Sequence, residues 1–224
     1  MKGLWVKDLL VLKKQKLAVF LTCMLAICSL VFFGQNGIMI GMAIFSATLS
    51  FIALNSLTFD QQNHGLMYLL TLPIQKKHYV IQKYLLLVFA TLCFVVLMTI
   101  ITGVFSEIAH WGLHFSYIFT RIYGVGAAFL IIVILTAQYQ IKNGPEKAQV
   151  AMSIIGAIVA IVIGAIVTAV KYTEWGNTIF NKMYTYYIDY GSLPFVVLFT
   201  IVGIIVIGTS CKTSIRTLET MEIQ

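Results

Sequence analysis

Apolar and polar residues alternate in long blocks along this chain. Stretches of about twenty apolar residues are separated by short polar, basic or aromatic connections. A helix of that length crosses about 30 Å of hydrocarbon, whereas the strands of a membrane barrel alternate apolar and polar residues over about ten positions. The pattern therefore predicts six transmembrane helices, at residues 17–33, 37–57, 83–105, 117–139, 150–170 and 193–211.

Composition agrees with a membrane protein. The chain has 224 residues, of which 60% are hydrophobic and 10% are charged, whereas a soluble domain carries roughly 25% charged residues. The longest polar connection has about 25 residues, too few to bury a separate core. We therefore expect an all-α polytopic membrane protein in which residues 1–224 form a single transmembrane domain.

The cationic residues predict the orientation of the chain. If the N-terminus, the connections after the second and fourth spans and the C-terminal tail share one side, that side holds all but Arg121, Lys171 and Lys182. Lysine and arginine gather on the cytoplasmic side, so both termini are expected there. The same bias accounts for the net charge of +7, with attraction to anionic membrane lipid and without a nucleic-acid partner.

Candidate chemistry is sparse in this sequence. All eight acidic residues fall outside the predicted spans, whereas ion-coupled transporters usually carry ionisable groups at membrane depth. There is no phosphate-binding G-x-x-x-x-G-K motif, and the four cysteines lack zinc-ligand spacing. Glu107, His110 and His114 could share a helical face but lack the order of a zinc protease motif. We expect no catalytic residue, no metal and no cofactor bound by this chain.

Two segments are predicted to lie on the membrane surface. Residues 1–16 form an interfacial helix with one apolar face, and the residues of that face are Leu4, Trp5, Leu9 and Leu12. The connection over residues 171–194 is dense in aromatic residues, which favour the headgroup region. It is either an aromatic belt or an outer gate over an exit path, and the gate candidates are Trp175, Tyr184 and Tyr187.

Small residues recur at four-residue spacing in two of the spans. Gly37 and Gly41 open the second span, and Gly156, Ala160 and Gly164 run along the fifth. Small residues let helix backbones approach closely in lipid. The pattern predicts close helix packing, either within one chain or at a subunit interface.

A short apolar segment stands between the second and third spans, in "GLMYLLTLPIQKKHYVIQKYL" (residues 65–85). Its apolar core is five residues, Leu66, Met67, Tyr68, Leu69 and Leu70. That is about 8 Å of helix and cannot cross a membrane. Pro73 disfavours helix at the residue before it and is suited to start the next helix. Such a segment needs either a partner or a lipid surface.

Two stretches, "MKGLWVKDLLVLKKQ" and "FDQQNHGLMYLLTLPIQKKHYVIQKYL", resemble the bacterial ABC-2 type transporter permeases. The resemblance is to a small six-span branch that includes exporters of amphipathic peptides such as phenol-soluble modulins, and bacteriocin-immunity exporters. The matching positions are Phe59, Asp60, Leu69, Leu72, Pro73, Ile74, Lys76, Tyr79 and Lys83.

The resemblance implies the membrane permease subunit of an ATP-binding-cassette exporter rather than an enzyme. Residues 66–70, with Pro73 and Lys76, would form a cytoplasmic coupling helix that docks on a separate ATPase. Two permease copies, or one copy and a related permease, would bind two ATPases that hold ATP and Mg²⁺. An amphipathic peptide or lipid-like cargo would leave the cytoplasm across the bacterial cell membrane. The alternative is a stand-alone scaffold, assembly factor or bacteriocin-immunity protein without transport.

Overall fold

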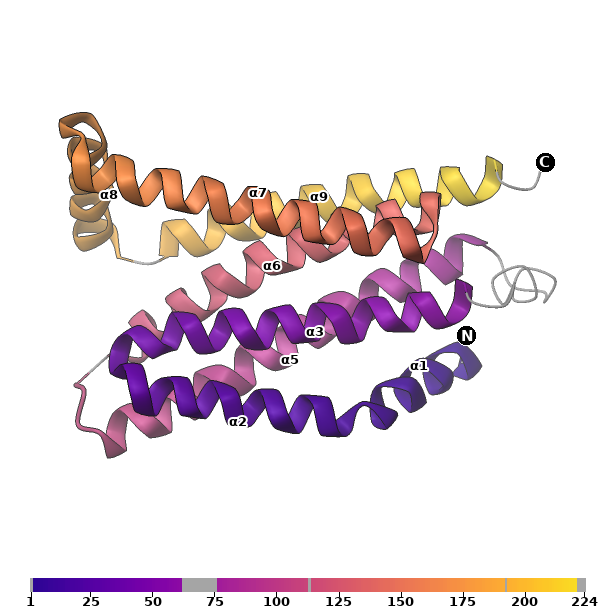
Figure 1. Cartoon of the computed structure of the whole chain (residues 1–224), viewed down its shortest axis with the longest axis horizontal. Helices are drawn as coiled ribbons and strands as arrows, with labels where there is room; N and C mark the ends of the chain where they lie inside the picture. The colour runs from indigo at the N-terminus through magenta and orange to yellow at the C-terminus, as the bar shows by residue number, and fades with distance from the viewer. Residues whose placement is uncertain (1, 62–75, 113, 192, 221–224) are drawn as a thin grey trace.

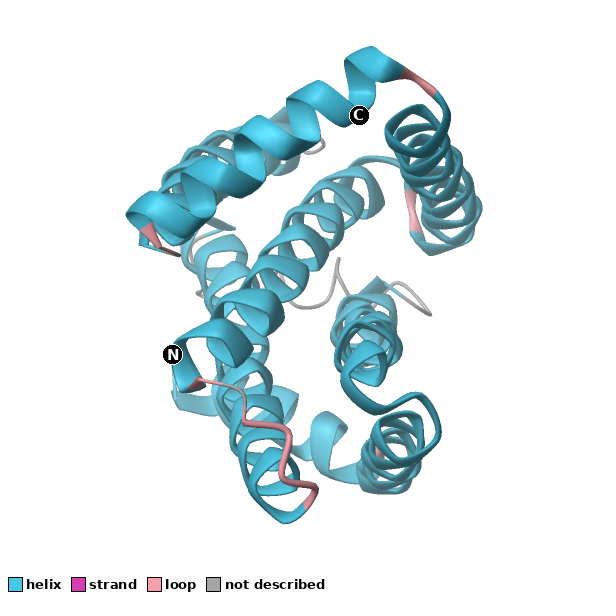
Figure 2. Cartoon of the chain, turned by 90° about the vertical axis from the view of Figure 1, so that its left-hand side faces the viewer, coloured by secondary structure: helices cyan, strands magenta, loops and turns pink. Residues whose placement is uncertain are grey.

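The computed structural model describes residues 2–61, 76–112, 114–191 and 193–220 as helices joined by short connections (Figures 1 and 2). No strand occurs among these residues. The elements in chain order are α1 (Lys2–Lys14), α2 (Lys16–Phe33), the 3-10 turn η1 (Gly34–Asn36), α3 (Gly37–Gln61), α5 (Lys76–Ile108), α6 (Phe115–Asn143), α7 (Pro145–Tyr172), α8 (Glu174–Tyr190) and α9 (Leu193–Thr220).

Four helical stretches of the described chain are long and apolar enough to cross a membrane. They are Lys16–Thr48, Lys76–Ile108, Phe115–Asn143 and Leu193–Thr220. The first of them turns back on itself at η1, so that α2 and α3 run side by side (Figure 1). The all-α membrane class predicted from the apolar blocks is confirmed.

The bundle has two distinguishable ends. The start of α1, the end of α9, the start of α5 and the α6–α7 connection lie together at one end, which we call the terminal end (Figure 1). The η1 turn, the α5–α6 connection and α8 lie at the other end, which we call the α8 end. The helix α8 runs across the bundle axis there, and a hydrogen bond from the Gly176 amide to the Thr173 hydroxyl caps its start (3.1 Å).

The hairpin of α2 and α3 depends on two glycines. A Cβ atom at Gly37 would lie 2.1 Å from the Ser29 carbonyl oxygen, and one at Gly41 would lie 2.6 Å from the Ser29 hydroxyl. Glycine at these two positions therefore lets the backbones of α2 and α3 approach more closely than a larger residue would permit. Gly156 and Gly164 differ, because a Cβ atom at either would meet no atom within 4 Å. They lie on an open face of α7.

The helix α6 forms the centre of the bundle and contacts α3, α5, α7 and α9. The core is split into two hydrophobic clusters along its length. The cluster nearer the terminal end contains Tyr84, Leu87 and Ile134. The cluster nearer the α8 end contains Phe45 and Met98.

Candidate functional site

An ion cluster is buried at the terminal end, where α1, α3 and α5 meet. Asp8 is fully buried, and Asp60 and Lys83 are each only 5% exposed. Ser56 and Asp60 lie one helical turn apart on α3, and Tyr79 and Lys83 lie one turn apart on α5, so each helix presents both of its residues on one face.

The ammonium group of Lys83 is the centre of this cluster. Its Nζ atom lies 2.7 Å from Asp8 Oδ1, 2.8 Å from Asp60 Oδ2 and 2.9 Å from Ser56 Oγ. A lysine ammonium has three protons to donate, and each of these three contacts uses one of them. The side chain of Lys83 is therefore fully satisfied without water.

The two carboxylates are also satisfied. Asp8 accepts hydrogen bonds from the Ser56 hydroxyl (3.0 Å) and the Gln82 amide (3.2 Å). Asp60 accepts one from the Tyr79 hydroxyl (3.0 Å) and pairs with Lys7, whose side chain is partly exposed. Two aspartates and two lysines make the cluster electrically neutral, which is the arrangement in which buried charges are tolerated.

The burial of Asp8 changes the reading of α1. In the sequence Asp8 lies within one turn of Trp5, a residue of the predicted interfacial face. Asp8 itself contacts the protein, because it is bonded to α3 and α5, and the neighbouring Trp5 is half-buried. The side chains of Leu4, Leu9 and Leu12 lie outside the described part. The helix α1 covers Lys2–Lys14, and an interfacial helix over residues 1–16 stays a prediction.

The predicted coupling segment, Leu66 to Pro73, lies outside the described residues. Its flanks are described. Asp60, in the last turn of α3, belongs to the ion cluster. Lys76, the first residue of α5, donates a hydrogen bond from Nζ to the carbonyl oxygen of Leu218 in the last turn of α9 (2.9 Å). A cation is favourable at a helix C-terminus. The contact joins the start of α5, on the C-terminal side of the segment, to the end of α9.

A second polar group joins α5, α6 and α9 close to the terminal end. The Tyr84 hydroxyl lies 2.8 Å from Ser214 Oγ and 3.3 Å from Ser210 Oγ. Ser210 donates in turn to Gln138 Oε1 (2.5 Å). These contacts hold α9 against α5 at that height, whereas Figure 1 shows the two helices diverging toward the α8 end.

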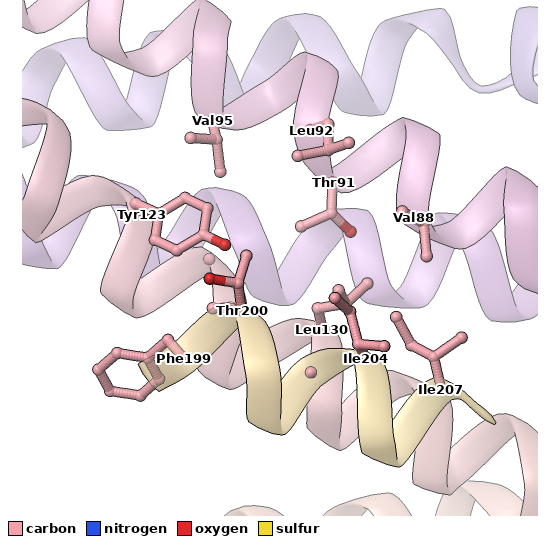
Figure 3. Close-up of a pocket in the computed structure, with 13 residues that line it drawn as sticks. Val88, Thr91, Leu92, Val95, Tyr123, Leu130, Phe199, Thr200, Ile204 and Ile207 are labelled. Carbon is pink, nitrogen blue, oxygen red and sulfur yellow. The ribbon is translucent and has the colours of Figure 1, made fainter. Parts of the chain in front are cut away.

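An apolar crevice of about 180 Å³ lies where α5 and α9 diverge, with α6 as its floor (Figure 3). It occupies the interval between the two hydrophobic clusters. Its lining residues include no charged side chain. They are Val88, Thr91, Leu92 and Val95 of α5, Tyr123, Gly126, Ala127 and Leu130 of α6, and Phe199, Thr200, Gly203, Ile204 and Ile207 of α9.

The candidate gate residues are not brought together. Trp175 is 74% exposed near the start of α8. Tyr187 is half-buried near its end, with its ring 5.8 Å from that of Phe195 on α9. Their separation of twelve positions corresponds to roughly 18 Å of helix. The side chain of Tyr184 lies outside the described part. Trp175 and Tyr187 therefore lie well apart along α8, and an outer gate formed by these residues stays a prediction.

Tyr187 also approaches the start of α6. Burial raises the pKa of the Tyr187 hydroxyl above its ordinary value, and the nearby Tyr117 adds to the rise. The positive charge of Arg121 lowers the pKa of Tyr187 and so opposes this rise. The Arg121 guanidinium lies 4.3 Å from the centre of the Tyr117 ring. Arg121 thus has an aromatic partner at the α8 end.

Glu107, His110 and His114 are all exposed at the α5–α6 connection. Among the residues that the structure describes, no group of three His, Cys, Asp or Glu side chains could hold a metal ion.

Sequence reasoning missed the ion cluster because its charged residues come from three distant segments. The signal that was available is the one-turn spacing of Ser56 with Asp60 and of Tyr79 with Lys83, at the ends of two apolar blocks. A polar pair on one face at the end of a span indicates that this face meets protein rather than lipid.

These features define a multi-pass helical membrane protein. Comparison with protein families gives the more specific result: residues 3–219 match the ABC-2 family transporter proteins, and the chain belongs to that family. Searches of curated proteins and of solved structures gave no match.

Proposed function

We propose that this chain is the membrane permease subunit of an ATP-binding-cassette exporter in the bacterial cytoplasmic membrane. The observation that carries the proposal is the match to ABC-2 transporters over residues 3–219, which includes nearly the whole bundle. ATP hydrolysis would take place in a separate ATPase, present in two copies beneath two permease subunits. The subunits would be two copies of this chain or this chain with a related permease.

In this proposal six helices span the membrane: α2, α3, α5, α6, α7 and α9. The short turn at η1 supports counting α2 and α3 as two spans. The start of α1, the end of α9 and the α6–α7 connection lie at the terminal end (Figure 1), where most lysines and arginines of the chain also lie. Positive residues favour the cytoplasmic side, so the terminal end faces the cytoplasm and α8 lies at the outer surface.

The short apolar segment from Leu66 to Leu70 would be the coupling helix. Its flanks are attached to the ion cluster through Asp60 and to α9 through Lys76. A displacement of the segment by the ATPases would therefore reach α1, α3, α5 and α9 together. We infer that this movement alternates access to an amphipathic peptide or a lipid-like cargo. The competing function is a membrane scaffold or immunity protein that transports nothing.

Cysteine labelling tests the orientation. In a background without the four native cysteines, Thr178→Cys in α8 should react with a membrane-impermeant thiol reagent added to intact cells. Asn143→Cys, at the end of α6, should react only after the cells are permeabilised. Labelling of Asn143→Cys but not Thr178→Cys in intact cells would reverse the orientation.

Energy use tests the exporter proposal against the scaffold. The purified chain should not hydrolyse ATP, because it lacks a phosphate-binding loop. With its ATPase in vesicles, transport should stop when the nucleotide site of the ATPase is destroyed. It should continue when the proton gradient is collapsed and ATP is maintained. A chain that co-purifies with no ATPase, or transport that follows the proton gradient, would contradict the proposal.

A further inference from the structure

The crevice between α5, α6 and α9 lies at the depth of the hydrocarbon. On α9 its lining begins at Phe199, six residues or roughly 9 Å from the start of the helix, and ends at Ile207, roughly 12 Å further along. All three helices are among those long and apolar enough to cross a membrane. The crevice therefore belongs to the middle of the membrane, away from either aqueous surface.

The crevice is open to the surroundings of the bundle. Leu92 on α5 and Ile204 on α9 line its two sides and are 50% and 67% exposed. In a membrane those exposed faces meet lipid. The hydrogen bonds of Tyr84 to Ser210 and Ser214 close the gap between α5 and α9 below the crevice. The space is thus a pocket that is closed at one end and accessible from the side.

Most polar atoms of the lining are not available to bind a polar ligand. The Thr91 hydroxyl donates to the Leu87 carbonyl (2.8 Å), and that of Thr200 donates to carbonyl oxygens of its own helix, at 2.5 Å for Val196. The Tyr123 hydroxyl points toward the crevice (Figure 3) and has no hydrogen-bond partner among the described residues. The lining therefore offers one hydroxyl in an otherwise apolar space.

The size of the crevice restricts its occupant. Its volume of about 180 Å³ is close to that of cavities that hold a single small hydrocarbon such as benzene, about 150 Å³. A peptide helix, which is about 10 Å wide, cannot enter it. A single extended hydrocarbon chain can lie along its length.

We propose that this crevice binds one hydrocarbon chain of a membrane lipid, which fills the gap between the two core clusters and braces α9 against α5. The lipid is favoured because the crevice opens sideways into the bilayer at chain depth, where acyl chains are the surrounding medium. The proposal requires only that the chain spans a membrane, and it stands whether or not the protein is an exporter.

Gly203 and Gly208 provide a matched pair of variants on α9. A Cβ atom at either position would meet no atom within 4 Å, so the backbone leaves room for a side chain at each, and Leu is the substitution used. Gly203 lines the crevice and Gly208 does not. Gly203→Leu therefore fills the crevice with a side chain, while Gly208→Leu adds the same bulk to α9 elsewhere. Gly126 is unsuitable, because a Cβ atom there would lie 2.7 Å from Val95 Cγ2.

Photolabelling tests the site directly. The purified chain, without ATPase or cargo, is placed in vesicles of phosphatidylglycerol and phosphatidylethanolamine with a trace of phospholipid carrying a diazirine on one acyl chain. Adducts should concentrate on residues 88–95 and 199–207. Gly203→Leu should reduce them about tenfold, since it excludes roughly two methylene groups of the chain, and Gly208→Leu should leave them unchanged. Adducts spread evenly over exposed apolar residues, unaffected by Gly203→Leu, would overturn the proposal.

A second measurement identifies the natural occupant. With p-benzoylphenylalanine in place of Phe199, irradiation of cell membranes should give an adduct with the mass of a phospholipid. A covalent dimer of the chain, or an adduct with a peptide cargo, would show that something else fills the crevice and would overturn the proposal. In detergent, added phospholipid should raise the melting temperature of the delipidated wild type and of Gly208→Leu, but not that of Gly203→Leu.

Discussion

Lys83→Met is expected to remove most of the folded protein from detergent extracts. The substitution deletes the ammonium group that neutralises Asp8 and shares Asp60 with Lys7. It leaves a buried carboxylate without a cation, because Asp8 is fully buried and has no other basic partner among the described residues. Removing one member of a buried ion pair costs about 3–5 kcal/mol, which is a large part of the stability of most domains.

The neutrality of the cluster gives a sharper test than the single variant. In Lys83→Met the cluster has a net charge of −1. Adding Asp8→Asn returns it to zero, with Asp60 still paired to Lys7. The double variant should therefore have a higher free energy of unfolding than Lys83→Met alone. The gain should exceed about 0.5 kcal/mol, which is the limit within which independent substitutions add.

Lys77→Met is the matched control, because Lys77 is an exposed lysine in the first turn of the same helix. An exposed charge contributes about 1 kcal/mol or less, so its thermal unfolding, followed by size-exclusion fluorescence, should be near wild type. If Lys83→Met also unfolds like the wild type, or if the two changes at Lys83 and Asp8 are simply additive, the cluster does not hold the helices together.

Leu69→Asp should separate the chain from its ATPase while the permease still inserts at normal levels. Buried anchors of a protein interface contribute about 2 kcal/mol or more on truncation, which is a loss of affinity of roughly 30-fold. A carboxylate costs more, since it would be desolvated without a partner. Tyr68→Asp should behave in the same way. The measurement is the amount of ATPase recovered when the tagged permease is purified.

Two further variants separate a protein groove from a lipid surface as the partner of this segment. Leu69→Trp should also weaken ATPase binding if a groove fits leucine, because overpacking destabilises. It should be harmless on a lipid surface, which tryptophan favours. Lys77→Gln, which removes only an exposed charge, is expected to have a smaller effect. Full ATPase recovery with both Leu69 variants would rule out a coupling role for the segment.

The helical membrane class was predictable because it depends on the length of the apolar blocks. Each block lies within a helix, and the helices run beyond the predicted limits, as α5 does by starting at Lys76 rather than at residue 83. When spans are predicted from hydropathy alone, polar residues such as Gln82 set the boundary of the predicted span. In the bundle they are helical and satisfied by neighbouring helices.

The helix α8 and the ion cluster were not predicted. Aromatic residues dominate residues 171–194 and indicate the headgroup region, and this signal concealed the Thr173 cap that starts a helix. The cluster depends on tertiary contacts between α1, α3 and α5. Asp8 in a basic, amphipathic segment gave no sign that it would be buried. The crevice depends on the angle between α5 and α9, which no local pattern encodes.

The order in which the cluster residues are synthesised has a consequence for membrane insertion. Lys7 and Asp8 leave the ribosome first, Ser56 and Asp60 follow with the α2–α3 hairpin, and Lys83 comes last. Until α5 has emerged, Asp8 lacks its cation and must stay in water at the membrane surface. Burial of Asp8 with a neutralising partner is therefore expected only after Lys83 at the start of α5 has been synthesised.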